Sequence, residues 1–221
     1  MSSHREPNQP NFDRVAALYR WAEYLALGPI LQRARTHLLP HLAHAEHALI
    51  LGDGDGRFLE QLLLRNPHCQ ALAVDSSAAM LHRLRRRCLR SVPNAATRLH
   101  TLQQNILTLD PPPATDLVVT HFVLDCLRQT DVNALTTRLA AHLAPGALWL
   151  VSDFALPPHR ILRPFAALYI RALYAAFRLL TDLKTSTLPD PQSALHNAGL
   201  TRIHRHTFLG GLIYTELWRL E

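Results

Sequence analysis

The sequence predicts an open α/β sheet that ends in an antiparallel hairpin. Apolar runs of strand length alternate with helical patterns along most of the 221 residues, and this alternation is typical of parallel strands joined by right-handed crossovers. The C-terminal part differs, because two strand-like runs, 201–208 and 212–219, are separated by Gly210 and Gly211. Two such runs with glycine between them indicate a hairpin.

The expected elements follow one another in a regular order. Strands are expected at 48–52, 70–75, 98–103, 116–121 and 147–153, and helices near 56–66, 77–90 and 131–143. The apolar runs fit strands that helices cover on both faces of the sheet. We expect one domain over 1–221, made of a helical segment at 11–40 that is interrupted at Gly28-Pro29, a core at 48–153, a second helical segment at 158–189 and the hairpin at 201–219.

The composition fits a soluble protein of the cytoplasm. With 48% hydrophobic and 18% charged residues, the chain can bury one full core. The polar start "MSSHREPNQPNFDR" lacks the apolar centre of a secretory leader, and no apolar run is long enough to span a membrane. The three cysteines have no paired spacing, which suits a reducing compartment.

The net charge of +6 comes from arginine and leaves two interpretations. Five arginines lie between 83 and 90 on a helix whose other face keeps core spacing, so we expect a solvated helix face, with an anionic partner as the alternative. Nucleic acid is not an expected partner, because no aromatic cluster adjoins these arginines. Histidine is plentiful, but His41, His44 and His47 have no fixed local geometry, so no metal is expected.

The stretch "ALILGDGDGRFLEQLL" at 48–63 places a glycine-rich turn after the first strand and before a helix. Such a turn brings a ligand close to backbone amides and a helix N-terminus. The two acids of the turn, Asp53 and Asp55, would repel a pyrophosphate. A ligand with positive character therefore fits this turn better than a dinucleotide.

A second acid points to a nucleoside. Asp75 ends the second expected strand, 19 residues beyond Gly56, and a carboxylate at this place can bind both hydroxyls of a ribose. A ribose-binding acid beside an acidic glycine turn describes a pocket for a cationic nucleoside. S-adenosylmethionine, with its sulfonium and amino groups, is the obvious candidate.

Four segments of the chain resemble the class I S-adenosylmethionine-dependent methyltransferases. They are "FDRVAALYRWAEY", "GDGDGRFL", "VDSSAAML" and "LAPGALWLVSDF". The ensemble is most similar to the small-molecule branch that includes the ubiquinone/menaquinone C-methyltransferases. The resemblance implies a Rossmann-like class I methyltransferase fold, with a seven-stranded sheet whose seventh strand is reversed and with a helical N-terminal lid.

The resemblance also implies a set of cofactor residues. It assigns Gly52, Asp53, Gly54 and Gly56 to the methionine side, Asp75 to the ribose, Ser76, Met80 and Asn105 to the adenine, and Tyr19 to a lid over the methionine end; Ile106 is a further cofactor-binding residue. Tyr19 also fits a core position of its helix. The acid that commonly stands two residues before the first glycine is Ile50 here, so the acid has moved into the turn, at Asp53 or Asp55.

Polar residues at the end of the fourth expected strand, "VVTHFVLDCL", are candidates for catalysis. His121 is the best general base, because an imidazole titrates near neutrality, and it also lies where the cofactor would bind. If a helix starts just after the strand, Asp125 lies one turn away and orients the ring of His121. The alternatives are a packing role for His121 and a capping role for Asp125, while Asp153 is either an acceptor contact or a turn residue.

The apolar segment "RPFAALYIRALYAAFRLLTDLK" after the fifth strand suggests the acceptor. Its helical pattern fits a wall for a hydrophobic small molecule, a homodimer contact, or a peripheral membrane contact. We expect methyl transfer to a small hydrophobic or aromatic acceptor, with O-methylation favoured. The alternatives are a non-catalytic S-adenosylmethionine-binding protein and an aminopropyltransferase, whose glycine turn is similarly acidic.

Overall fold

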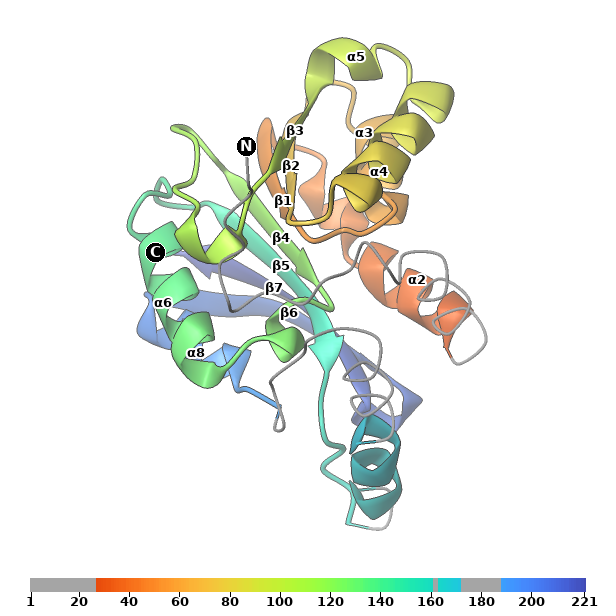
Figure 1. Cartoon of the computed structure of the whole chain (residues 1–221). Coiled ribbons are helices and arrows are strands. Elements are labelled where there is room, and N and C mark those ends of the chain that lie inside the picture. The colour runs from red at the N-terminus through yellow and green to blue at the C-terminus, as the bar shows by residue number, and fades with distance from the viewer. Residues whose placement is uncertain (1–26, 161–162, 172–187) are drawn as a thin grey trace, which may run out of the picture.

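One seven-stranded sheet organises the computed structural model, which describes residues 27–160, 163–171 and 188–221 (Figure 1). The strand order is β3-β2-β1-β4-β5-β7-β6. The strands are β1 (His47–Leu51), β2 (Gln70–Asp75), β3 (Leu99–Gln103), β4 (Leu117–His121), β5 (Leu148–Phe154), β6 (Leu200–Phe208) and β7 (Ile213–Leu220). Strands β1 to β5 are parallel, and β7 pairs antiparallel with both β5 and β6. The predicted fold, including the reversed seventh strand, is confirmed.

Helices cover both faces of this sheet. Figure 1 shows α3 (Arg57–Arg65) and α4 (Ala78–Ser91) on one face and α6 (Gln129–Ala140) and α8 (Pro191–Asn197) on the other. Each face has its own buried cluster of aliphatic side chains. Strand β1 is buried on both sides, which is why its sequence is a continuous apolar run.

Two short helices were not predicted from the sequence. Helix α5 (Ala95–Arg98) has four residues, and α8 has seven, so neither shows enough turns for a periodic pattern. The start of helix α8 is nevertheless indicated by its local sequence. Pro191 occupies its first turn, and the Asp190 side chain accepts a hydrogen bond of 3.0 Å from the backbone of Ser193.

The N-terminal helical segment is described from residue 27 onward. Helix α2 (Gly28–Thr36) begins at the predicted Gly28-Pro29 interruption, because proline fits the first turn of a helix. The short helix η1 (Leu39–Leu42) follows and packs with α3 and α4 on the same face of the sheet. Most of the expected lid, 11–26, lies outside the described residues.

Stacked histidine rings connect this segment to the edge strand β6. His37 stacks on His206 with ring centroids 3.9 Å apart, and His41 stacks on His204 at 4.0 Å. Burial, together with His206 and other nearby cationic groups, lowers the pKa of His37. Among the described residues, no group of three or more histidine, cysteine or acidic side chains is placed to hold a metal ion.

The described part of the chain has no helix that is both long and apolar enough to cross a bilayer.

Candidate cofactor site and active site

The register of the sheet brings three predicted site residues to one edge. Leu51 of β1 pairs with Val74 of β2 and with Thr120 of β4. The residues that follow them, Gly52, Asp75 and His121, therefore lie next to one another where the parallel strands end. This is the edge at which open α/β sheets bind their ligands.

The three glycines of the turn all have positive φ angles, but their surroundings differ. A Cβ atom at Gly52 would lie 2.3 Å from Val123 Cγ2, and one at Gly56 would lie 2.8 Å from Leu84 Cγ. At Gly54 a Cβ atom would meet nothing within 4 Å. Gly56 is thus required for the packing of α4, whereas Gly54 leaves its backbone open to a ligand.

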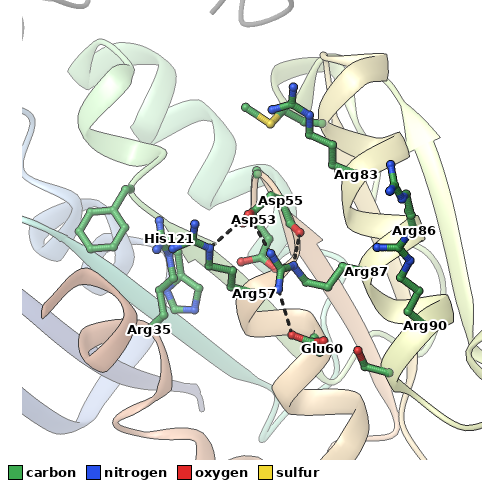
Figure 2. Close-up of a pocket in the computed structure, with 15 residues that line it drawn as sticks. Arg35, Asp53, Asp55, Arg57, Glu60, Arg83, Arg86, Arg87, Arg90 and His121 are labelled. Carbon is green, nitrogen blue, oxygen red and sulfur yellow. Dashed lines mark hydrogen bonds and ion pairs between the residues drawn. The ribbon is translucent and has the colours of Figure 1, made fainter. Parts of the chain in front are cut away.

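A cavity of about 450 Å³ lies between the glycine turn, α2, α4 and the end of β4 (Figure 2). Five of the predicted site residues line it: Gly52, Asp53, Gly54, Met80 and His121. Other described cofactor candidates do not line this cavity: Gly56 lies under α4, Asp75 ends β2 and Ser76 follows it, and Asn105 and Ile106 follow β3. Tyr19 and most of the second half of the expected helical segment at 158–189 lie outside the described residues.

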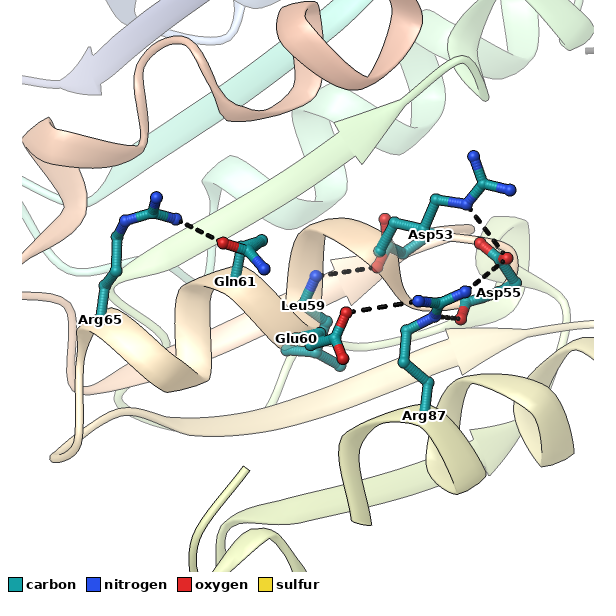
Figure 3. Close-up of polar contacts among 8 residues, drawn as sticks. Asp53, Asp55, Leu59, Glu60, Gln61, Arg65 and Arg87 are labelled. Atoms are coloured by element: carbon teal, nitrogen blue, oxygen red, sulfur yellow. Dashed lines mark hydrogen bonds and ion pairs between the residues drawn. The ribbon is translucent and has the colours of Figure 1, made fainter. Parts of the chain in front are cut away.

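Asp53 is a buried acid, and one of its two carboxylate oxygens has no hydrogen-bond partner among the described residues. Its Oδ2 atom accepts a hydrogen bond of 3.0 Å from the backbone of Leu59 in the first turn of α3 (Figure 3). Its Oδ1 atom is buried and has no hydrogen-bond partner in the described part of the chain. Burial raises the pKa of Asp53 to about 7, against the effect of the Leu59 N–H and of the nearby Arg35 charge.

Asp55, the second acid of the turn, is held by arginines. Its Oδ2 atom lies 3.1 Å from Arg57 Nε and 3.0 Å from Arg87 Nη2. Arg87 also donates to the Asp55 backbone carbonyl at 2.9 Å and contacts Glu60 Oε2 at 3.3 Å (Figure 3). Since Asp55 is already paired, Asp53 is the acid of the turn that is placed to meet a cation.

Local hydrogen bonds orient the residues predicted to contact the ribose and the adenine. Asp75 Oδ1 accepts a bond of 2.8 Å from the backbone of Ser77, the N-cap residue of α4. Asn105 Oδ1 accepts a bond of 2.8 Å from the backbone of Leu107 at the start of η2 (Ile106–Thr108).

His121 is buried at the end of the cavity. Its ring packs edge-on against Phe58 with centroids 4.6 Å apart, and only 2% of the residue is exposed. Neither ring nitrogen has a hydrogen-bond partner among the described residues. Burial and the Arg35 charge lower the pKa of His121 well below its ordinary value, so the imidazole is neutral at physiological pH.

The predicted hydrogen bond between Asp125 and His121 is wrong. The chain after β4 does not continue into an α-helix, because Phe122 has a φ of 56° and η3 (Leu124–Cys126) is a short 3-10 turn. Asp125 interacts with Asp153 instead, and its backbone donates to Asp153 Oδ2 at 3.1 Å.

The two carboxyl groups, Asp125 and Asp153, form a buried pair. Burial raises the pKa of both, so the pair holds a proton between them. Asp153 accepts two backbone N–H bonds, from Asp125 and Phe154, and these bonds favour its ionised form. The pair thereby joins the turn after β4 to the end of β5.

Several residues of the cavity were not among the predicted site residues, and Arg35 and Phe122 are two of them. Arg35 is 7% exposed, and its guanidinium carbon lies 5.0 Å from the centre of the Phe122 ring. Both residues line the cavity. A signal for Arg35 was present, because this arginine shares an apolar helix face with Leu31, Ala34 and Leu38.

Comparisons with known proteins find similarity to methyltransferases. A family described as "Methyltransferase domain" matches residues 49–149, a little under half of the chain. A trans-aconitate 2-methyltransferase from Paracidovorax citrulli (strain AAC00-1) is 34% identical over 131 residues, which are 57% of this chain and 46% of that protein. The chain thus spans about half the length of this curated relative.

Solved structures share the fold. An O-methyltransferase family protein from Burkholderia thailandensis superposes with a TM-score of 0.73 at 16% identity, covering 96% of this chain and 64% of that one. The N-methyltransferase NodS from Bradyrhizobium japonicum WM9, in complex with S-adenosyl-l-homocysteine, gives 0.60 at 18% identity, covering 86% and 88%.

The strand order and the solved structures give this chain a Rossmann-like class I methyltransferase fold, and the match to the methyltransferase domain supports S-adenosylmethionine as its cofactor. Within this chain, residues 49–149 are similar to the methyltransferase-domain family. The curated relative above is named for trans-aconitate, so the resemblance to the ubiquinone/menaquinone branch stays a prediction.

Proposed function

We propose that this protein transfers a methyl group from S-adenosylmethionine to an oxygen atom of a small acceptor. The observation that carries the proposal is the buried Oδ1 atom of Asp53, which has no partner among the described residues and belongs to a cavity wall beside the open backbone of Gly54. A buried carboxylate without a partner is costly, and a cationic ligand removes that cost. When bound, the cofactor supplies an electrophilic methyl group on its sulfonium.

The charge of the cavity favours an acceptor that carries a carboxylate. Arginines line it on several sides: Arg35, Arg57, Arg83, Arg86, Arg87 and Arg90. Arg57 and Arg87 are engaged by Asp55 and Glu60, whereas Arg86 and Arg90 are exposed on α4. Methylation of a carboxylate oxygen also agrees with the name of the curated relative, since trans-aconitate is an unsaturated tricarboxylate.

A hydrophobic or aromatic acceptor is the second candidate, and it rests on a different observation. In the helical residues 163–171, Phe165 is 70% exposed and Leu168 is 67% exposed. Their neighbour Ile170 is buried and packs in a cluster with partly buried residues that include Cys126 and Leu212. An apolar acceptor would be bound by this helix rather than by the arginines.

The two acceptor classes require different chemical roles of His121. A carboxylate is already ionised at neutral pH and needs no base, so a neutral His121 would only orient it by hydrogen bonding. A phenol must lose a proton during transfer, and His121 would then act as the general base. Because burial and Arg35 disfavour the protonated ring, His121 suits the first role better.

The test is an assay of S-adenosylhomocysteine release with a panel of di- and tricarboxylic acids and a panel of phenols and quinols, using the wild type and His121→Gln. For a carboxylate acceptor we expect turnover that His121→Gln lowers by about tenfold or less without changing the pH profile. For a phenol we expect a loss of about 100-fold or more. Cofactor binding without turnover on either panel would indicate a non-catalytic protein, and turnover of decarboxylated S-adenosylmethionine with a polyamine would indicate an aminopropyltransferase.

A further inference from the structure

The α4 side of the cavity is strongly basic. The cavity follows this helix from Met80 to Ser91, which is about 16 Å of helix. Figure 2 shows this side of the cavity across Asp53 and Asp55 from His121. Four arginines of α4 line it: Arg83, Arg86, Arg87 and Arg90.

The acids on this side of the cavity do not neutralise all of these arginines. Asp55 and Glu60 both form ion pairs with Arg87. Arg86 and Arg90 are exposed, and neither side chain has a hydrogen-bond or ion-pair partner in the described part of the chain. Two guanidinium groups that line the cavity are therefore left for a ligand.

The spacing of Arg86 and Arg90 is a second observation. The two residues are four positions apart, so they are neighbours on one face of α4. Like charges at this spacing repel each other and destabilise a helix. Arg90 is compensated by its place in the last turn, near the negative end of the helix dipole, but Arg86 lies before that turn. An anion between the two guanidinium groups removes their repulsion and accepts their N–H donors.

We propose that this end of the cavity binds a small polyanion, a molecule with two or more neighbouring phosphate or carboxylate groups, through Arg86 and Arg90. The two arginines are separated by about 6 Å along the helix, which suits two adjacent anionic groups better than a single one. Ser91 lines the same part of the cavity, and its hydroxyl supplies a further donor. The volume of about 450 Å³ is that of a small-molecule site, and the nearby Asp55 and Glu60 would repel the backbone of a nucleic acid.

The polyanion lies beside the methyl donor and does not replace it. Asp53 Oδ1 and the open backbone of Gly54 belong to the glycine turn, whereas Arg86 and Arg90 belong to α4. This site goes beyond the proposed function and does not depend on it.

Calorimetry with pyrophosphate and with citrate, at one fixed ionic strength, tests the site without relying on turnover. We expect the wild type to bind at least one of these probes with a Kd below about 1 mM. Arg86→Gln and Arg90→Gln should each weaken that binding about three- to tenfold, because exposed charges are partly screened. The double variant should lose at least about tenfold.

Arg85→Gln is the matched control. Arg85 is exposed on the same helix but does not line the cavity. The control removes the same net charge, so it measures the effect of overall electrostatics alone, and its affinity for the probe should stay within about twofold of the wild type. Thermal unfolding checks that each variant is folded.

The location beside the donor is tested by titrating S-adenosylhomocysteine into protein saturated with the bound probe. Its affinity should stay within about threefold of that of the free protein, and mutual exclusion of the two ligands would contradict the proposed location. Absence of binding of both probes, or equal effects of Arg85→Gln and Arg86→Gln, would overturn the polyanion site and leave the methyltransferase proposal in place. Binding of a single-stranded oligonucleotide through Arg86 and Arg90, with neither probe bound, would overturn it in favour of nucleic acid. Failure to bind S-adenosylhomocysteine alone would count against the proposed function and not against this site.

Discussion

At the scale of single residues, the two carboxylate oxygens of Asp53 have different roles, one in the start of α3 and one in the proposed binding of a ligand. Oδ2 accepts the Leu59 N–H at the start of α3, and Oδ1 lacks a partner in the described chain. Asparagine at this position would keep the first bond and lose the negative charge. The substitution Asp53→Asn therefore separates the contribution to the helix from the contribution to binding.

We predict that binding of S-adenosylhomocysteine depends on pH through Asp53. Its pKa of about 7 means that the carboxyl is partly protonated at neutral pH, and a cationic ligand binds the ionised form. Affinity of the wild type should fall about tenfold between roughly pH 8 and pH 6. Calorimetry at these pH values should show weaker binding and a smaller pH dependence for Asp53→Asn, and the same slope in both proteins would contradict the prediction.

Gly54 provides a second test at this scale, with Gly146 as its control. Both glycines have positive φ and open space where a Cβ would be, but only Gly54 lines the cavity. Alanine at either position should cost about 1–2 kcal/mol of stability through backbone strain alone. We expect Gly54→Ala also to weaken S-adenosylhomocysteine binding at least about tenfold, measured beside urea unfolding. Equal affinities for the two variants would show that ligand does not approach Gly54.

At the scale of elements, Arg87 connects α4 by ion pairs to the glycine turn and to α3. It contacts Asp55 and Glu60, and its side chain is 33% exposed. Partial exposure and solvent screening limit such ion pairs to about 1 kcal/mol. The turn that Arg87 contacts also carries Asp53. These ion pairs therefore stabilise part of the cavity wall.

We predict that Arg87→Gln lowers the free energy of unfolding by about 1 kcal/mol and that the loss shrinks at high salt. Arg86→Gln, on the exposed side of the same helix, should change stability by less than about 0.5 kcal/mol. Urea unfolding at low and high ionic strength measures both. A loss for Arg87→Gln that does not respond to salt would assign its effect to packing instead of charge.

The helices and strands also show how much of the fold and of the candidate site could be predicted from the sequence. Each of the seven strands is within one residue of its expected position. The buried strands β1, β4 and β5 are apolar runs that glycine and polar turns delimit, and Gly210-Gly211 separates the two strands of the hairpin. The glycine turn directly follows β1 and Asp75 ends β2, and these positions are why the sequence suggested them as site residues. The partner of Asp125 could not be found in this way. It depends on the backbone turn at Phe122 and on β5 lying beside β4, and no local pattern encodes that adjacency.

At the scale of the whole molecule, the buried pair of Asp125 and Asp153 links stability to pH. A carboxyl whose pKa is raised by folding contributes stability below its ordinary value of about 3.9 and loses that contribution as pH rises through the raised pKa. The pair should therefore make the protein less stable as alkali removes the shared proton.

We predict that Asp125→Asn flattens the decrease in unfolding temperature from about pH 5 to about pH 9, because the amide keeps a hydrogen-bond donor for Asp153 at every pH. Asp110→Asn, at an exposed acid, is the control and should follow the wild type. Thermal scans across this range measure the difference. Parallel curves for the wild type and Asp125→Asn would show that the pair retains no proton above pH 5.

The cavity draws its wall from residues 35 to 122, whereas β5, the helical residues 163–171 and the terminal hairpin come later in the chain. Donor recognition and the later segments are therefore separable in the gene. A chimaera that keeps the chain through β5 and takes everything after it from a relative should retain its affinity for S-adenosylhomocysteine while exchanging the compounds it modifies.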